Sequence, residues 1–181
     1  MTVMSRSWAM PNADTFSVGP IREFVERWTR DVPGAPCIVD PFARNSEVGS
    51  ITNDLNPETA AMFHMDAVEF CQMLTTGIAD VVIFDPPYSP RQMAEVYQKV
   101  GVTGMARSQN ARLYREVRDG LDRILKPGGI ALSFGWNSAG FGEKRGYERL
   151  EVLLVAHGGA HNDTICVAES KRVAAPRTGE H

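Results

Sequence analysis

The sharpest chemical feature of the sequence is the run Phe84-Asp85-Pro86-Pro87-Tyr88-Ser89, which follows the apolar stretch Val81 to Phe84. The two prolines fix two backbone φ angles and remove two N–H donors, so the backbone is rigid and its carbonyls can accept hydrogen bonds. Asp85 precedes a proline and is held extended, and Tyr88 adds a flat aromatic face. This set suits an exocyclic amine, which would donate to the carboxylate and to a carbonyl while its ring stacks on the tyrosine. The amine nitrogen would then face an electrophile, and placement would be the main catalytic contribution. The alternative is a proline turn that ends a strand and packs against the tyrosine.

Four aspartates follow short stretches with strand patterns: Asp40, Asp54, Asp66 and Asp85. In an open α/β sheet, ligands bind at the carboxyl ends of the strands. Crowded carboxylates repel one another unless something binds between them. A ligand rich in hydroxyl and amine donors could form hydrogen bonds with these carboxylates. Each aspartate taken alone also fits a turn or a helix cap.

Alternating strand and helix patterns must position these residues. Strands are expected at 37–39, 50–53, 62–65, 81–84, 130–134, 148–156 and 164–168. Helices are expected from Gly19-Pro20 onward and at 67–74, 92–99 and 110–125, with a turn at 126–129. The stretch 81–84 is apolar throughout, which is typical of a strand buried on both faces of a parallel sheet. The alternation predicts an α/β fold.

The bulk composition fits one globular domain. The chain has 181 residues, and we expect a single domain over residues 1–172 with a loose tail over 173–181. No apolar run reaches the roughly 18 residues of a membrane span, and residues 1–11 lack the apolar stretch of a signal peptide. Three widely spaced cysteines without a CxxC pair favour buried, reduced thiols and a reducing cytoplasm.

Charge is distributed unevenly, although the net charge is only -3. The segment 89–126 carries eight basic and four acidic residues, whereas the chain before it is acidic. Such a basic segment can meet a phosphate backbone. A solvated helix face explains the same charges.

Several motifs resemble those of one enzyme family. Asp85-Pro86-Pro87-Tyr88 after an apolar strand resembles the catalytic motif of amino-methyltransferases that act on nucleic-acid bases, particularly the DNA adenine-N6 methyltransferases. The N-terminal motif and the three cofactor motifs of this family resemble, in chain order, Trp8-Ala9-Met10-Pro11 with Phe16, Val39 to Ala43, Asn53 to Pro57, and Met65 to Ala67. The resemblance covers about residues 8–169 and is closest to the small stand-alone enzymes of phages and prophages.

The resemblance implies a Rossmann-like, seven-stranded class I methyltransferase sheet, mostly parallel with an antiparallel last strand. It implies S-adenosylmethionine as cofactor and methyl transfer to N6 of adenine in DNA, with the target base flipped out of the helix. The catalytic residues it implies are Asp85, Pro86, Pro87 and Tyr88. The cofactor-binding residues it implies are Trp8, Met10, Pro11, Phe16, Asp40, Pro41, Phe42, Ala43, Arg44, Asp54, Leu55, Asp66, Ala67 and Asp85.

The first cofactor motif departs from the family pattern, which carries glycines after the aromatic residue. Here Phe42 is followed by Ala43, Arg44, Asn45 and Ser46. Without glycine, the backbone approaches a ligand less closely. Two roles remain open for Arg44, namely pairing with the cofactor's carboxylate and a solvent-facing loop position.

No separate target-recognition domain is evident, so we expect DNA contacts near the catalytic motif itself. The candidates are Arg91, Lys99, Arg107, Arg112, Arg115, Trp136 and Asn137. The recognised base sequence would then be short, or a second subunit in a homodimer would contribute to its recognition. Two alternatives remain, an RNA base amino-methyltransferase acting on guanine N2 or adenine N6, and a catalytically idle binding subunit. No metal is expected, since His157, His161 and Asp163 fit a hydrogen-bonded turn around Gly158-Gly159.

Overall fold

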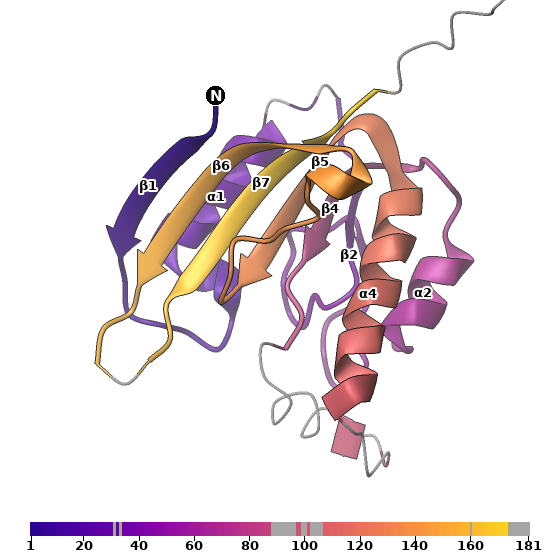
Figure 1. Ribbon diagram of the computed structural model, residues 1–181. Helices are drawn as coiled ribbons and strands as arrows, with labels where there is room; N and C mark the ends of the chain where they lie inside the picture. The colour runs from indigo at the N-terminus through magenta and orange to yellow at the C-terminus, as the bar shows by residue number, and fades with distance from the viewer. Residues whose placement is uncertain are drawn as a thin grey trace, which may run out of the picture.

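The computed structural model describes residues 1–30, 32, 34–87, 97, 98, 101, 107–159 and 161–173 (Figure 1). Within them, seven strands form one sheet in the order β1-β6-β7-β5-β4-β2-β3. The strands are β1 Val3–Trp8, β2 Ile38–Asp40, β3 Ile51–Thr52, β4 Ala79–Phe84, β5 Leu125–Gly135, β6 Tyr147–Ala156 and β7 Thr164–Lys171. Neighbouring strands are parallel except where β7 pairs with β5 and β6. The expectation of a mostly parallel α/β sheet with an antiparallel last strand is confirmed.

Helices cover the two faces of the sheet unequally. Helix α1 Gly19–Arg30 lies behind β6 and β7 in Figure 1, and its residues Ile21, Phe24 and Val25 pack into the core of that face. Helices α2 Ala67–Met73 and α4 Arg107–Ile124 cover the opposite face. They approach closely because Gly120 has no side chain, and a Cβ there would lie 2.6 Å from the Cβ of Cys71. Two short 3-10 helices, η1 Thr15–Ser17 and η2 Glu143–Arg145, complete the described elements.

Strand β4 runs through the middle of the sheet, as its apolar sequence predicts. Val82 and Phe84 pack into the core under α2 and α4, and Val81 and Ile83 pack into the core under α1. Pairing with β2 on one edge and with β5 on the other fixes the register of β4 and therefore the position of Asp85, which follows it directly.

The predicted strand at 62–65 is wrong. Only one bridge forms there, between Asn53 and Phe63. The next rung is lost because the N–H and carbonyl of Met65 bind the side-chain amide of Asn53 instead (3.1 and 3.0 Å).

The sheet nevertheless has seven strands, because β1 joins it at the edge. The hydrophobic pattern of the sequence does not indicate β1. Its residues Val3, Met4 and Trp8 are exposed, so no buried face produces a period of two. Backbone pairing with β6 makes the strand instead. The turn predicted at 126–129 is likewise wrong, because β5 begins at Leu125 and runs through these residues, with a register shift against β4 at Ala79/Val81.

Other expectations are only partly covered by the described residues. Most of the helix expected at 92–99 and the tail from 174 onward lie outside them. The three cysteines are free, with Cys71 and Cys166 buried and Cys37 half-buried. In the part of the chain that is described, no helix is long and apolar enough to cross a membrane.

Candidate active site

A pocket of about 580 Å³ opens where β2, β3 and β4 end. The residues after each of these strands meet in its wall, since parallel neighbours end at the same edge of the sheet. The predicted site residues among its lining are Pro41, Phe42, Arg44, Asp54, Leu55, Ala67, Asp85, Pro86 and Pro87. The structure therefore brings the expected cofactor motifs and the expected catalytic motif together in one cavity, which we call the rim pocket.

Asp40 lies beneath the rim pocket and is fully buried. Its Oδ1 accepts a hydrogen bond from the backbone N–H of Phe42 (3.0 Å), and its Oδ2 has no hydrogen-bond partner among the described residues. Burial raises the pKa of Asp40 to about 8; the Phe42 N–H opposes this rise, and the nearby charges of Asp85 and Asp54 add to it. At neutral pH this aspartate is therefore mostly protonated.

Replacing Asp40 with asparagine should change the pH dependence of stability. Between about pH 4 and pH 8 the folded protein holds a proton on Asp40 that the unfolded chain lacks, so stability falls as pH rises through this window. The slope is at most about 1.4 kcal/mol per pH unit, and asparagine, which does not titrate, removes it. Urea denaturation at pH 5 and pH 8 measures the effect. A free-energy difference between variant and unmodified protein that is the same at both pH values would contradict the assignment.

Asn53 holds the floor of the rim pocket together. It is fully buried, and its side-chain amide donates to the carbonyls of Pro41 (3.2 Å) and Met65 (3.0 Å). Its Oδ1 accepts from the Met65 N–H (3.1 Å). One side chain thus joins the ends of β2 and β3 to the segment before α2. The only signal for this role in the sequence is the place of Asn53 at the end of the expected strand 50–53, before Asp54.

Asp54 lies at the end of β3 and lines the rim pocket. Its Oδ1 accepts from the backbone N–H of Asn56 (2.8 Å), and its Oδ2 accepts from the backbone N–H of Arg44 (3.1 Å). The carboxylate is thereby fixed at the pocket wall, and each of its oxygens can accept further bonds.

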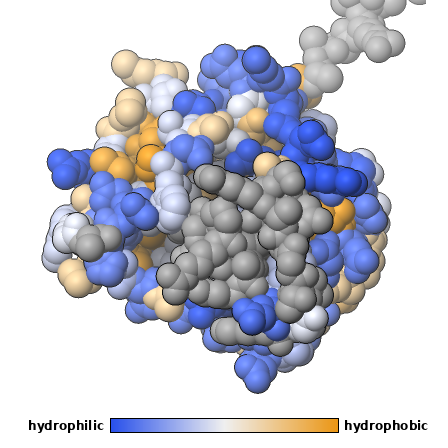
Figure 2. Space-filling view, turned by 60° about the horizontal axis from the view of Figure 1, so that its bottom comes forward, coloured by the Kyte–Doolittle hydropathy of each residue, from blue (hydrophilic) through white to orange (hydrophobic). Residues whose placement is uncertain are grey.

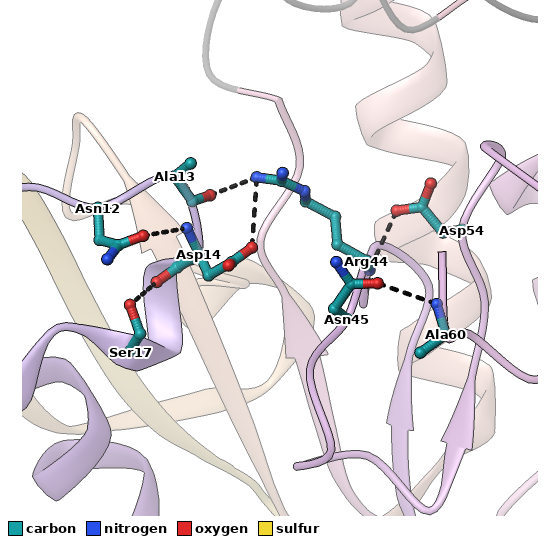
Figure 3. Close-up of polar contacts among 8 residues, drawn as sticks. All are labelled: Asn12, Ala13, Asp14, Ser17, Arg44, Asn45, Asp54 and Ala60. Carbon is teal, nitrogen blue, oxygen red and sulfur yellow. Dashed lines mark hydrogen bonds and ion pairs between the residues drawn. The ribbon is translucent and has the colours of Figure 1, made fainter. Parts of the chain in front are cut away.

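Arg44 crosses from the loop after β2 to the N-terminal segment (Figure 3). Its Nη1 donates to the carbonyl of Ala13 and lies 3.7 Å from Oδ1 of Asp14. The backbone of Arg44 has φ 51°, and Arg44 is the one non-glycine residue with positive φ among those described. This is the left-handed region that glycine adopts without strain.

Aromatic packing fixes the end of β4 and the residues that follow it. Pro86 is buried, and Asp85 and Pro87 are half-buried. The hydroxyl of Tyr114, on α4, donates to the carbonyl of Pro87. The Tyr114 ring also packs edge-on against Phe84 at 6.3 Å between centroids, and the guanidinium of Arg118 lies 4.7 Å from the centre of the Phe84 ring. These two α4 residues were not anticipated, because nothing in the sequence spacing pairs α4 with the end of β4.

Asp66 caps α2 and does not line the rim pocket. Its Oδ1 accepts from the Val68 N–H (2.8 Å), and its Oδ2 accepts from the Tyr97 hydroxyl (2.7 Å). Met65, Ala67 and Tyr97 provide the pocket wall at this position. Asp40 and Ala43 are both buried and are also absent from the lining.

The N-terminal residues expected to bind the cofactor are not in the pocket lining. Trp8 and Met10 are exposed, and Phe16 packs edge-on against Phe134, at 5.1 Å between ring centroids. The adjacent residues Asn12, Ala13 and Thr15 line the pocket instead. Their polar, loop-like sequence gives no signal of this placement, which depends on where β1 ends. Pro11 is also outside the lining.

The expected nucleic-acid contacts are only partly described. Tyr88, Arg91 and Lys99 lie outside the described residues, and α4 begins at Arg107. Arg112 and Arg115 are exposed on α4, and Nε of Arg112 pairs with Glu116 (2.7 Å). Trp136, after β5, is 44% exposed, and Asn137 accepts from the Ala139 N–H. Figure 2 brings forward the side of the molecule at which α4 begins, and most of the coloured residues there are hydrophilic.

The histidine turn is hydrogen-bonded. The imidazole of His157 bonds the carbonyl of Ala9 (2.8 Å) and the hydroxyl of Thr164 (2.9 Å), and Asp163 accepts from the His157 N–H. The described residues include no group of three or more histidine, cysteine, aspartate or glutamate side chains placed to hold a metal ion.

Comparison with known proteins identifies the fold. No protein-family model matches the sequence, and no curated protein matches it. Solved structures do match. TrmN from Thermus thermophilus superposes with a TM-score of 0.57 at 15% identity, over 85% of this chain and 49% of TrmN. The chain thus spans about half the length of TrmN.

Two further structures match over most of their length. The Escherichia coli protein yhhF, described as a methyltransferase, has a TM-score of 0.57 at 12% identity, over 90% of each chain. A Haemophilus influenzae protein described as a methylase has a TM-score of 0.54 at 11% identity, over 91% of this chain and 92% of its own. Together with the strand order, these matches show that the chain has the Rossmann-like fold of class I methyltransferases.

Proposed function

We propose that the protein is an S-adenosylmethionine-dependent methyltransferase that methylates an exocyclic amine of a nucleic-acid base, with N6 of adenine in DNA as its target. The observation that carries the proposal is the rim pocket, which brings Asp54, after β3, together with the Asp85-Pro86-Pro87 motif, after β4, on the two sides of β2. Proteins described as methyltransferases or methylases share the fold.

The residues of the rim pocket fit the cofactor. Asp54 presents a fixed carboxylate for ribose hydroxyls, and Phe42 and Leu55 offer apolar surface for a base. Asp40 lies beneath with an Oδ2 that makes no hydrogen bond among the described residues. When bound, S-adenosylmethionine supplies a methyl group on a sulfonium, which needs little further activation.

The chain's own contribution to the reaction is to hold and orient the target amine. Asp85 accepts one hydrogen of the amine through its carboxylate. The carbonyl of Pro87 already accepts from Tyr114, so we assign the second hydrogen to the carbonyl of Pro86. The carboxylate of Asp85 stabilises the positive charge that the nitrogen gains on methylation, and the nitrogen then releases one of its two hydrogens as a proton to solvent. Stacking of the base on Tyr88 stays a prediction from the sequence.

Replacing Asp54 with asparagine should weaken nucleoside binding. The expected loss is roughly 10-fold for both S-adenosylhomocysteine and 5′-methylthioadenosine, because both carry the ribose and the charged acceptor is lost. Asparagine keeps one oxygen that can accept from the Asn56 N–H, whereas its NH2 group cannot accept from the Arg44 N–H. Titration calorimetry measures both dissociation constants, and unchanged values would move the ribose contact elsewhere.

The substrate is tested by methylation of defined polymers. The protein is incubated with methyl-labelled S-adenosylmethionine and with double-stranded DNA, single-stranded DNA or RNA, and the labelled nucleoside is then identified. We expect N6-methyladenine from DNA. The Asp85→Ala protein, purified in the same way, controls for a contaminating methyltransferase.

The other outcomes contradict different parts of the proposal. Label at guanine N2 or adenine N6 of RNA, without label in DNA, would replace DNA by RNA as substrate. Cofactor binding without transfer to any polymer would favour a binding subunit that keeps the fold. Failure to bind either S-adenosylmethionine or S-adenosylhomocysteine would overturn the methyltransferase assignment itself.

A further inference from the structure

Arg44 is the only lysine or arginine among the described residues that line the rim pocket. The carboxyl groups in the lining are those of Asp54, Glu58 and Asp85. Among the described residues of the lining, Arg44 therefore offers the only positive charge to an anionic group of a ligand. The charge pattern therefore gives Arg44 a distinct role toward the ligand.

The backbone places Arg44 at a position that favours glycine. Its φ of 51° lies in the left-handed region, where a side chain carries a conformational cost that glycine does not. Where glycines follow a strand, backbone N–H groups can approach an anion closely. Here the sequence Arg44-Asn45-Ser46 occupies that loop, and a long cationic side chain can supply the donors instead.

The guanidinium still has donors available for a ligand. Its contacts to Ala13 and Asp14 both involve Nη1 (Figure 3), and Nε and Nη2 make no hydrogen bond among the described residues. The Asp14 carboxylate at 3.7 Å is beyond hydrogen-bond distance, and the Arg44 side chain is 52% exposed. A planar guanidinium binds a carboxylate through two parallel hydrogen bonds when two of its donors face it.

We infer that Arg44 binds the carboxylate of the cofactor's amino-acid part and thereby determines specificity for cofactors that carry it. The inference rests on the proposed function. The acidic residues of the pocket suit the positive sulfonium and ammonium groups of the same ligand. Arg44 thus takes the role that backbone N–H groups of a glycine-rich loop would otherwise have.

Two ligands separate this role from a general effect on the pocket. S-adenosylhomocysteine carries the amino-acid part, whereas 5′-methylthioadenosine has the same nucleoside and thioether without it. In Arg44→Gly, affinity for S-adenosylhomocysteine should fall by roughly 10- to 100-fold, the value of a hydrogen-bonded charge pair. Affinity for 5′-methylthioadenosine should stay within about twofold, since no charge pair is lost there. Glycine suits the positive φ, so the backbone is not strained by the substitution.

Two further variants control for charge and for the contact with the N-terminal segment. Arg44→Lys keeps the charge without the planar fork and should bind S-adenosylhomocysteine with an affinity between those of the unmodified protein and Arg44→Gly. Asp14→Ala removes the ion-pair partner but leaves the guanidinium, and it should bind at least as tightly as the unmodified protein.

The results that would overturn the inference are distinct from failure of the proposed function. If Arg44→Gly lost the same affinity for both ligands, Arg44 would serve only to position the segment 12–15. Weaker binding of S-adenosylhomocysteine by Asp14→Ala would lead to the same conclusion. Unchanged affinity for S-adenosylhomocysteine in Arg44→Gly would place the carboxylate elsewhere. If the unmodified protein bound neither ligand, the proposed function would fail before Arg44 was tested.

Discussion

Replacing Asp85 with alanine is expected to lower the rate of methyl transfer by at least about 100-fold while leaving cofactor affinity within about twofold. The carboxylate would hold the target amine, and this interaction strengthens as the nitrogen gains charge, so its loss costs about 2–4 kcal/mol of barrier. Single-turnover transfer to a DNA oligonucleotide measures the rate, and calorimetry measures the affinity.

A matched control lies on the same strand. Asp80, near the start of β4, pairs with Lys126 (2.6 Å) and accepts from the Cys37 N–H (2.9 Å), and it is absent from the rim pocket. Asp80→Ala should therefore leave the transfer rate unchanged. Near-normal turnover in Asp85→Ala would remove Asp85 from the mechanism.

The second large effect concerns Asn53. Asn53→Ala should lower the free energy of unfolding by about 2–4 kcal/mol, because it leaves the carbonyls of Pro41 and Met65 and the N–H of Met65 buried without a partner. Urea denaturation followed by circular dichroism measures this loss.

Asn56 provides the comparison, because its half-buried side chain makes one local, solvent-exposed hydrogen bond, accepting from the Glu58 N–H (3.1 Å). Asn56→Ala should cost less than about 1 kcal/mol. Equal losses in the two variants would show that the buried amide of Asn53 does not hold the strand ends together.

The centre of the molecule could be predicted from its sequence. Strand β4 is apolar along its length and packs into both cores, so its position and that of Asp85 follow from burial alone. The meeting of Asp54 and Asp85 in one pocket then follows from the parallel order of the strands, as expected. Their binding roles stay predictions.

The periphery of the site could not be predicted in the same way. β1 has no buried face to produce a pattern, and its pairing with β6 depends on backbone groups that all residues share. The path of the Arg44 side chain toward Ala13 depends in turn on where β1 ends. The strand expected at 62–65 does not form, because the side-chain amide of Asn53 bonds the backbone groups of Met65 that a neighbouring strand would otherwise bond. Hydrophobic patterns do not detect such a side-chain contact.

The pairing of β1 with β6 also sets an order of assembly during synthesis. Val3 pairs with Glu151, so β1 must wait after its synthesis until β6 has been made. At about 5–20 residues per second, that wait lasts on the order of 10 seconds or more. Residues 12–15 follow β1 directly and form one wall of the rim pocket. The nascent chain can therefore complete the central strands early, but the wall of the rim pocket formed by residues 12–15 is completed only after β6 has been made.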